Sequence, residues 1–219
     1  MSTGPKQALF AEFAAIARAL GHPHRLEMLE RIAQGERGVE AIAGRLGLSV
    51  ANASQHLQLL KRAGLIASRR DGRFILHRLA DPAVLTLMRA LYHVGERNVA
   101  EVDRILRGYF RDRDAMEPVT RAELMELSRA GAVTVLDVRP REEFAAGHLP
   151  GAVNMPLDEL EARLGELDGG RDIVAYCRGQ YCVLSFEAVA ALRARDRRAR
   201  RLEEGFPEWR AAGLPVEAP

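Results

Sequence analysis

The stretch that decides the fold of the C-terminal half is Tyr176-Cys177-Arg178-Gly179-Gln180-Tyr181-Cys182, which contains both cysteines of the 219-residue chain. The run 172–176 precedes it, and residues 183–192 follow with apolar positions at helical spacing. The pattern predicts a buried strand that ends at Cys177 and a helix that begins near Cys182. Backbone N–H groups in such a loop, together with the positive end of the helix, stabilise an anion and favour a thiolate. We therefore expect a reactive thiol in this loop.

Composition limits the class of protein. The chain is 47% hydrophobic and 28% charged, which is typical of a globular protein of two ordinary domains. No apolar run approaches the roughly 20 residues that span a bilayer, and the N-terminus lacks a signal pattern. We expect a cytoplasmic protein with no membrane partner, in which two cysteines are reactive rather than structural. A net charge of +2 does not by itself indicate a nucleic-acid partner.

The N-terminal half has the layout of a winged helix-turn-helix. Helical patterns cover 7–20, 24–34, 39–46 and 50–63, and a Gly-containing turn lies at 47–49. A hairpin follows at 65–79, with Asp71-Gly72 as the expected tip, and a long helix is expected from Asp81-Pro82 to Phe110. A short helix, a turn, a second helix and a basic hairpin together predict a DNA-binding module.

The candidate DNA contacts are polar residues on the second helix and arginines on the hairpin. Short polar groups read phosphates and base edges, and arginines bind phosphates or enter the minor groove. A solvated helix face and turn is the alternative, but the agreement of layout, polar face and basic wing favours double-stranded DNA. The candidates are Ser49, Asn52, Ser54, Gln55, His56, Lys61, Arg62, Arg69, Arg70 and Arg73.

Residues 7–100 resemble the ArsR family of bacterial repressors, on the segments 20–29 (LGHPHRLEML) and 48–57 (LSVANASQHL). The resemblance implies a homodimer, joined through the first helix and the long helix after the wing, on an inverted-repeat operator. The apolar residues of the long helix either form that interface or cover the monomer core; they are Leu85, Leu87, Met88, Leu91, Val94, Val99, Val102 and Ile105.

The metal site of some ArsR proteins is not expected here. Residues 39–46 contain no cysteine, and the long helix offers only Asp81, His93 and Glu96, fewer than four ligands. We expect no metal and no cofactor.

The C-terminal half predicts an α/β fold with a mainly parallel sheet. A capping box at Thr120–Glu123 begins it. Strands are expected at 133–138 and 173–176, and helices at 142–146, 158–164 and 183–194. The basic run 193–201 is expected to be a solvated helix end and loop. The predicted bounds are 1–112 for the DNA-binding and dimerisation domain, 113–118 for a linker and 119–219 for the second domain.

Residues 118–219 resemble a single rhodanese domain, on the segments 135–140 (VLDVRP), 142–156 (EEFAAGHLPGAVNMP) and 204–216 (EGFPEWRAAGLPV) and on the Cys177 loop. The resemblance implies that Cys177 takes sulfur from a donor such as thiosulfate, a persulfide or a polysulfide and holds it as a persulfide. Arg178 is expected to add charge at the loop mouth, and the loop amides to bind the anion. Those amides belong to Arg178, Gly179, Gln180, Tyr181, Cys182 and Val183.

Three further residues are expected to be structural, and the role of Cys182 remains open. Asp137 and Arg139 are expected to form a buried pair, and His148 to cap the loop before Pro150. The loop departs from the rhodanese pattern in that glycine is third rather than fourth and Cys182 is sixth. Cys182 is either a small residue buried at a helix start or a resolving thiol that captures the persulfide.

Three functions remain. The first is a transcriptional repressor that responds to sulfane sulfur or redox state through Cys177. The second is a sulfurtransferase whose DNA-binding half localises it or regulates its own gene. The third is a protein-docking module, which the complete Cys177 loop disfavours. Steady-state turnover of a sulfur donor separates the first two.

Overall fold

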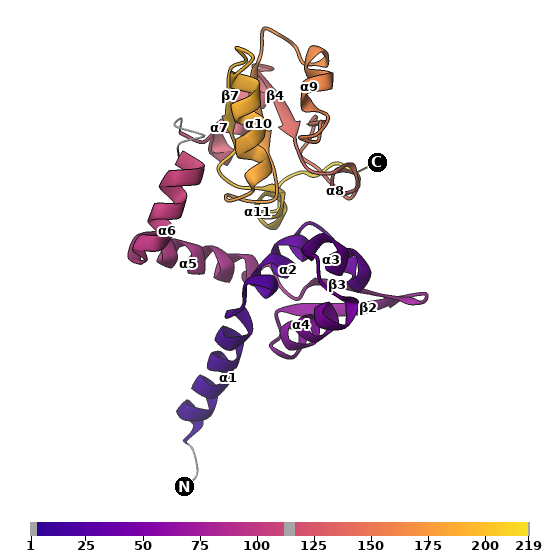
Figure 1. Cartoon of the computed structure of the whole chain (residues 1–219), viewed down its shortest axis with the longest axis vertical. Coiled ribbons are helices and arrows are strands. Elements are labelled where there is room, and N and C mark those ends of the chain that lie inside the picture. The colour runs from indigo at the N-terminus through magenta and orange to yellow at the C-terminus, as the bar shows by residue number, and fades with distance from the viewer. Residues whose placement is uncertain (1–3, 112–116, 219) are drawn as a thin grey trace. The chain divides into compact units, whose positions relative to one another are not determined.

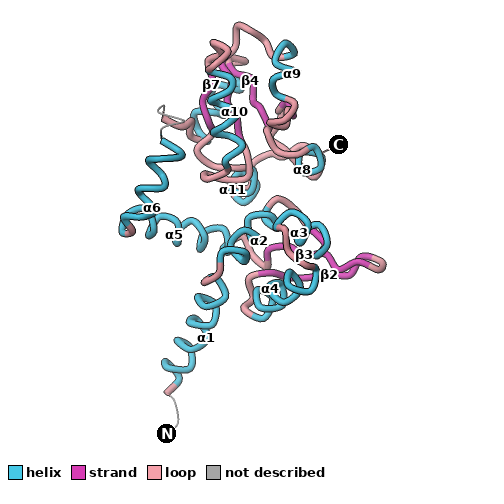
Figure 2. The backbone as a smooth tube through the Cα atoms, viewed as in Figure 1, coloured by secondary structure: helices cyan, strands magenta, loops and turns pink. Residues whose placement is uncertain are grey.

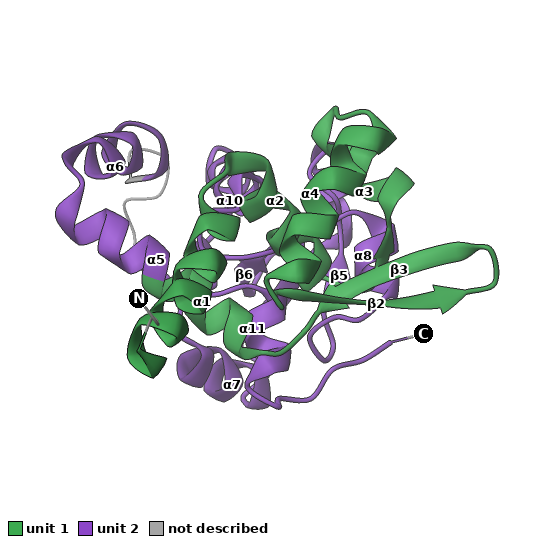
Figure 3. Ribbon diagram, turned by 90° about the horizontal axis from the view of Figure 1, so that it is seen from below, with its two compact units in different colours: residues 1–90 green, residues 91–219 purple. Residues whose placement is uncertain are grey.

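The computed structural model describes residues 4–111 and 117–218, which divide into two compact units, Met1–Ala90 and Leu91–Pro219 (Figure 3). The division falls inside helix α5 (Ala83–Asn98), and the expected domain bounds remain a prediction. Residues 113–116 of the expected linker lie outside the described residues. In the described part of the chain, no helix combines the length and hydropathy that a membrane crossing requires.

The first unit is a winged helix-turn-helix, as predicted. Helix α3 (Val39–Leu46) and helix α4 (Val50–Arg62) flank the turn, and strands β2 (Ile66–Asp71) and β3 (Phe74–Leu79) form the wing. Figure 2 shows this hairpin extending past α3 and α4. The unit also contains α1 (Pro5–Leu20), α2 (Pro23–Ala33) and β1 (Arg37–Gly38), which pairs antiparallel with β3. Its core contains Met28, Leu29, Ile32, Ile42, Ala53, Leu57 and Leu60.

The wing turn differs by one residue from the expected one. Asp71 pairs with Phe74, so the two loop residues are Gly72 and Arg73 rather than Asp71 and Gly72. Gly72 has a φ of +60° and no positive φ occurs at Arg73, which corresponds to a type II′ turn with glycine first. The turn therefore places Arg73 at the tip of the wing.

The long helix expected to reach Phe110 is broken. Helix α5 ends at Asn98, α6 (Ala100–Ile105) follows, and a π-helix covers Leu106–Arg111. Val99 between them has extended backbone, with φ −116° and ψ 105°. Two local effects favour the break: the Asn98 side chain donates to the Val94 carbonyl at 2.9 Å, and a β-branched residue follows.

The second unit contains a four-stranded parallel sheet in the order β5-β4-β6-β7, which confirms the predicted α/β class. Helix α10 covers one face of this sheet (Figure 1). Apolar residues of α10 and α9 pack on that face, and residues of α7 and α11 pack on the other. The elements are α7 (Arg121–Arg129), β4 (Val133–Asp137), α8 (Arg141–Ala145), β5 (Val153–Asn154), α9 (Leu160–Arg163), β6 (Asp172–Tyr176), α10 (Val183–Arg193), β7 (Ala199–Arg201) and α11 (Phe206–Ala211).

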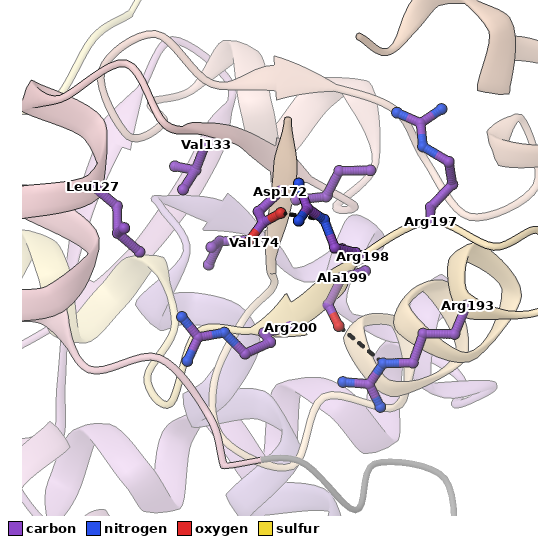
Figure 4. Close-up of a pocket in the computed structure, with 10 residues that line it drawn as sticks. Leu127, Val133, Asp172, Val174, Arg193, Arg197, Arg198, Ala199 and Arg200 are labelled. Atoms are coloured by element: carbon purple, nitrogen blue, oxygen red, sulfur yellow. Dashed lines mark hydrogen bonds and ion pairs between the residues drawn. The ribbon is translucent and has the colours of Figure 1, made fainter. Parts of the chain in front are cut away.

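The basic run 193–201 is not simply a solvated helix end, because its last three residues form edge strand β7. Four arginines of this run line a concavity of about 320 Å³ beside the strand (Figure 4). Arg193 donates to the Ala199 carbonyl at 2.9 Å, Arg198 pairs with Asp172 at 2.7 Å, and Arg200 with Glu123 at 2.5 Å. These contacts brace β7 against the sheet and α7.

Asp137 and Arg139 form the expected buried pair. Both side chains are fully buried, and their Oδ2 and Nη2 atoms lie 2.6 Å apart. The guanidinium also donates to the Gly147 carbonyl at 2.8 Å and lies 4.2 Å from the Phe206 ring centre. His148 stacks on Phe144, with ring centres 3.6 Å apart, a contact consistent with the expected structural role. The pair therefore connects the end of β4 with the α8 loop and α11.

Removing the partner of a buried charge gives the first prediction. Asp137→Ala leaves the Arg139 guanidinium buried without its counter-charge, and we expect a loss of about 3–5 kcal/mol in the free energy of unfolding. Asp172→Ala is the matched control, because the ion pair it breaks is exposed and contributes no more than about 1 kcal/mol. Urea unfolding followed by the fluorescence of Trp209, the only tryptophan, reports on this domain. Equal losses in both variants contradict the prediction.

Candidate functional site

The exposed face of helix α4 carries the expected polar residues. The Ser49 hydroxyl caps the helix by accepting from the Asn52 N–H at 3.2 Å. The side chains of Asn52 and Gln55 are exposed on the first turns, and Lys61 and Arg62 are exposed on the last; Ser54 is half-buried. The face is therefore available to a DNA groove and its phosphates.

His56 is placed differently from these residues. Its ring packs against His22 at 4.5 Å between centroids and lies 6.0 Å from His24, both at the start of α2. Burial, followed by repulsion from His22, lowers the pKa of the His56 imidazole. The contact ties the recognition helix to α2, which the sequence pattern did not indicate, and a DNA contact by His56 remains only a prediction.

The three arginines of the wing that were expected to contact DNA are all exposed but have different local contacts. Arg69 pairs with Glu36 at 2.6 Å, and this hydrogen bond holds the pKa of the Glu36 carboxyl below its usual range. Arg70 donates to the Gly72 carbonyl at 3.0 Å, and Arg73 lies over the Phe74 ring. Because Glu36 offsets the charge of Arg69, the positive charge at the tip of the wing comes from Arg70 and Arg73.

The two cysteines occupy opposite ends of the loop between β6 and α10. Cys177 follows the last residue of β6 and is 2% exposed, and Cys182 is the N-cap of α10. Their Cα atoms are 6.1 Å apart, within the range of disulfides, and a disulfide joins them. The structure thus brings the expected nucleophile and the expected second thiol into direct contact.

The first half of the loop lies against Gly205, a residue that the sequence pattern did not single out. A Cβ at this position would meet the backbone of Arg178 and Gly179, including the Arg178 carbonyl oxygen at 2.6 Å. The Phe206 N–H donates to the Cys177 carbonyl at 3.0 Å, and the Gly205 N–H to the Glu208 carboxylate at 3.1 Å. Glycine therefore permits the start of α11 to hold this part of the loop.

Arg178 does not act as an isolated charge at the loop mouth. Its Nε and Nη2 atoms each lie 2.9 Å from the carboxylate of Glu143, whose side chain is only 3% exposed. Such a bidentate pair anchors the side chain and offsets its charge. An anion on Cys177 would then be stabilised mainly by backbone N–H groups of the loop. One of these groups, the Cys182 N–H, is already engaged, because it donates to the Gly179 carbonyl at 3.1 Å.

The second half of the loop contacts the end of helix α5 within the same compact unit. The Gln180 amide donates to the Glu96 carboxylate at 2.9 Å, and the rings of Tyr181 and Tyr92 are 5.6 Å apart. The Tyr181 hydroxyl is buried and has no hydrogen-bond partner among the described residues. Val183, the last residue of the expected anion-binding set, is 37% exposed at the start of α10.

Two family models match this chain. A helix-turn-helix domain model covers residues 20–69, and a rhodanese-like domain model covers residues 120–212. A solved structure similar to the first part is the homodimeric winged helix-turn-helix domain of a possible ArsR-family regulator from Mycobacterium bovis. It is 36% identical and covers 45% of this chain and 92% of that one, with a TM-score of 0.42.

Two curated relatives extend the comparison. A protein from Allochromatium vinosum named Sulfurtransferase is 34% identical over 88 residues, which are 40% of this chain and 80% of that protein. The HTH-type transcriptional regulator Rv0324 of Mycobacterium tuberculosis is 45% identical over 212 residues, which are 97% of this chain and 93% of that protein. The chain therefore belongs to the HTH-type transcriptional regulators in which an ArsR-type winged helix-turn-helix precedes a rhodanese-like domain.

Proposed function

We propose that this DNA-binding regulator is a repressor whose homodimer leaves an inverted-repeat operator when Cys177 takes up sulfane sulfur. The observation that carries the proposal is the contact between Cys177 and Cys182 at the end of β6, in a chain that also contains a recognition helix. A second thiol within bonding distance limits the lifetime of a persulfide, and this favours a switch over a continuous transfer reaction.

The chemistry requires only the two thiols and a donor. The Cys177 thiolate attacks the outer sulfur of a low-molecular-weight persulfide, RSSH, so that Cys177–S–SH forms and the thiol RSH leaves. The Cys182 thiol then attacks Sγ of Cys177, so that the disulfide forms and H₂S leaves. The two cysteines lose two electrons in total, and the transferred sulfur gains them as it becomes sulfide. The disulfide in the structure corresponds to the product of this sequence.

Exposed apolar side chains support a homodimer. Leu9, Phe10 and Phe13 on α1 are each more than half exposed, and Leu91 and Val94 on α5 are 42% and 57% exposed. Apolar helix faces of this kind are normally covered by a partner. A second copy of the chain is the expected partner, since the same helices in two copies form a self-complementary contact and place two recognition helices on one DNA duplex.

A sulfurtransferase is the second candidate, favoured by the likeness to the Allochromatium vinosum protein of that name. In that case an external acceptor must remove the sulfur from Cys177 before Cys182 attacks. Steady-state release of sulfite from thiosulfate, in the presence of an acceptor thiol, tests this function directly. Turnover that continues while operator affinity stays constant overturns the repressor proposal.

The sulfur chemistry predicts three different masses after treatment with a persulfide donor. The parent protein should lose two hydrogens as the disulfide forms, Cys182→Ser should retain one extra sulfur atom, and Cys177→Ser should be unmodified. Operator affinity measured in parallel should fall by about 5- to 150-fold in the parent, the range of ordinary allosteric coupling, and remain constant in Cys177→Ser. Modification of Cys182 before Cys177 would show that the nucleophile is assigned incorrectly.

The wing predicts a sequence-independent effect on DNA affinity. Arg70→Ala and Arg73→Ala should weaken binding to all duplexes similarly and reduce the slope of log Kd against log salt by about 0.9 for each lost phosphate contact. Asn52→Ala is the matched control on the recognition helix: it should relax sequence preference with little change in slope. Unchanged slopes in the arginine variants would exclude the wing from the interface. Electrophoretic or fluorescence titrations at several salt concentrations supply these values.

If α5 forms the dimer interface, a carboxylate introduced on its apolar face should dissociate the dimer. Leu91→Asp and Val94→Asp should each convert the dimer to a monomer, because an unpaired charge is costly in an apolar contact. Leu59→Asp on α4 is the matched control, since Leu59 is 44% exposed and lies on a helix outside the proposed interface. Sedimentation equilibrium gives the molar mass, and circular dichroism verifies folding. A folded dimer in both α5 variants places the interface elsewhere.

A further inference from the structure

Helix α5 takes part in both proposed activities, and its last two turns contact the cysteine loop. We propose that Tyr92 and Glu96 read the state of the Cys177–Cys182 pair through Gln180 and Tyr181, and so position the dimer helix according to the sulfur chemistry. The proposal rests on the sulfur-responsive function above. Its basis is the hydrogen bond from Gln180 to Glu96 at 2.9 Å and the edge contact of Tyr181 with Tyr92 at 5.6 Å.

The loop is anchored so that a change at the cysteines displaces its second half. The Arg178 side chain is held by Glu143, and the peptide between Arg178 and Gly179 lies against Gly205. At the other end, Cys182 begins helix α10, whose residues pack in the core of the domain. Formation or opening of the disulfide, or addition of a sulfur atom to Cys177, must therefore be accommodated mainly by Gln180 and Tyr181. These are the two residues that contact α5.

The two faces of α5 have different neighbours. Successive residues of an α-helix are rotated by about 100°, so Tyr92 and Glu96 lie on a face that is roughly 150° from the face with Leu91 and Val94. Glu96 is bonded to the loop, whereas Leu91 and Val94 are exposed and form part of the proposed dimer interface. A shift of the loop side of the helix therefore changes the orientation of the dimer side, with no additional element between them.

The segment Leu106–Arg111 provides a second attachment to the rhodanese domain. Tyr109 donates to the Glu187 carboxylate at 3.1 Å, and Phe110 contacts Phe186 with ring centres 4.8 Å apart, both on α10. Phe110 also touches the loop, because its ring centre lies 5.8 Å from that of Tyr181. The two contacts with α10 include no residue between the cysteines and hold the segment on the domain in every sulfur state, whereas the contacts of Gln180 and Tyr181 depend on that state.

The coupling between operator binding and the cysteine pair can also be measured through the midpoint potential of the two cysteines. If the dithiol form binds the operator ten times more tightly than the disulfide form, operator binding must shift the dithiol–disulfide midpoint potential by the same free energy, about 30 mV for this two-electron couple. The operator stabilises the dithiol, so the potential becomes less negative on DNA. A redox titration with and without operator DNA therefore reports the coupling without measuring any enzymatic activity.

The decisive experiment is a double-mutant cycle in the full-length protein. Glu96→Ala, Gln180→Ala and the double variant are compared with the parent for operator affinity in the dithiol and disulfide forms. We expect the ratio of the two affinities to fall from at least fivefold in the parent towards one in each single variant, with no further loss in the double variant. The matched control is Glu101→Ala, whose carboxylate pairs with Arg104 on α6 and should leave the ratio unchanged.

The possible outcomes distinguish the proposed function from the proposed role of Glu96 and Gln180. A parent protein whose operator affinity does not depend on sulfur state refutes the proposed function. A parent that responds, with single variants that respond to the same extent, leaves the function intact and refutes the role of Glu96 and Gln180. Cys177 should still gain sulfur in the Glu96→Ala variant, because Glu96 does not contact the thiol. If circular dichroism shows that Glu96→Ala is unfolded, Gln180→Ala tests the same bond from the loop side.

Discussion

The close approach of Gly205 to the peptide between Arg178 and Gly179 fixes the geometry on which the sulfur site depends. Only a residue without a Cβ permits this contact, and the adjacent Phe206 N–H then reaches the Cys177 carbonyl at 3.0 Å. The start of α11 thereby orients the residue that carries the reactive sulfur. Because the first half of the loop is held in this way, Cys182 at the start of α10 is directed back toward Cys177, and the two sulfurs meet.

Charge near the cysteines is balanced by residues that lie far apart in the sequence. Glu143 from α8 offsets Arg178, and Asp137 offsets the fully buried Arg139 at the end of β4. Both pairs remove charge that would otherwise be desolvated without compensation. Among the described residues, the two arginines nearest the cysteines are thus both paired with carboxylates, which under the proposed function would leave a persulfide to be stabilised by backbone N–H groups.

The sequence predicted those features that depend on local periodicity and on spacing within one segment. The helices of the winged module, the wing, strands β4 and β6 and the Asp137–Arg139 pair are examples. Strands of two or three residues, such as β5 and β7, have no period to detect. The break at Val99 depends on a side chain that competes for a backbone carbonyl. The contacts of Glu143, Gly205 and Glu96 with the loop were missed because tertiary packing, rather than spacing along the chain, brings these residues together.

Under the proposed function, the position of α5 would connect the sulfur site directly with the dimer interface. Tyr92 and Glu96 contact the loop between the cysteines, while Leu91 and Val94 on the other side of the same helix are exposed. A rigid helix with two contact faces transmits a displacement at one face to the other. Extended backbone at Val99 separates α5 from the segment docked on α10, so the two segments are distinct helices. If the helix couples the two sites in this way, operator DNA would in turn alter the thiol–disulfide equilibrium, since a coupling free energy acts equally in both directions.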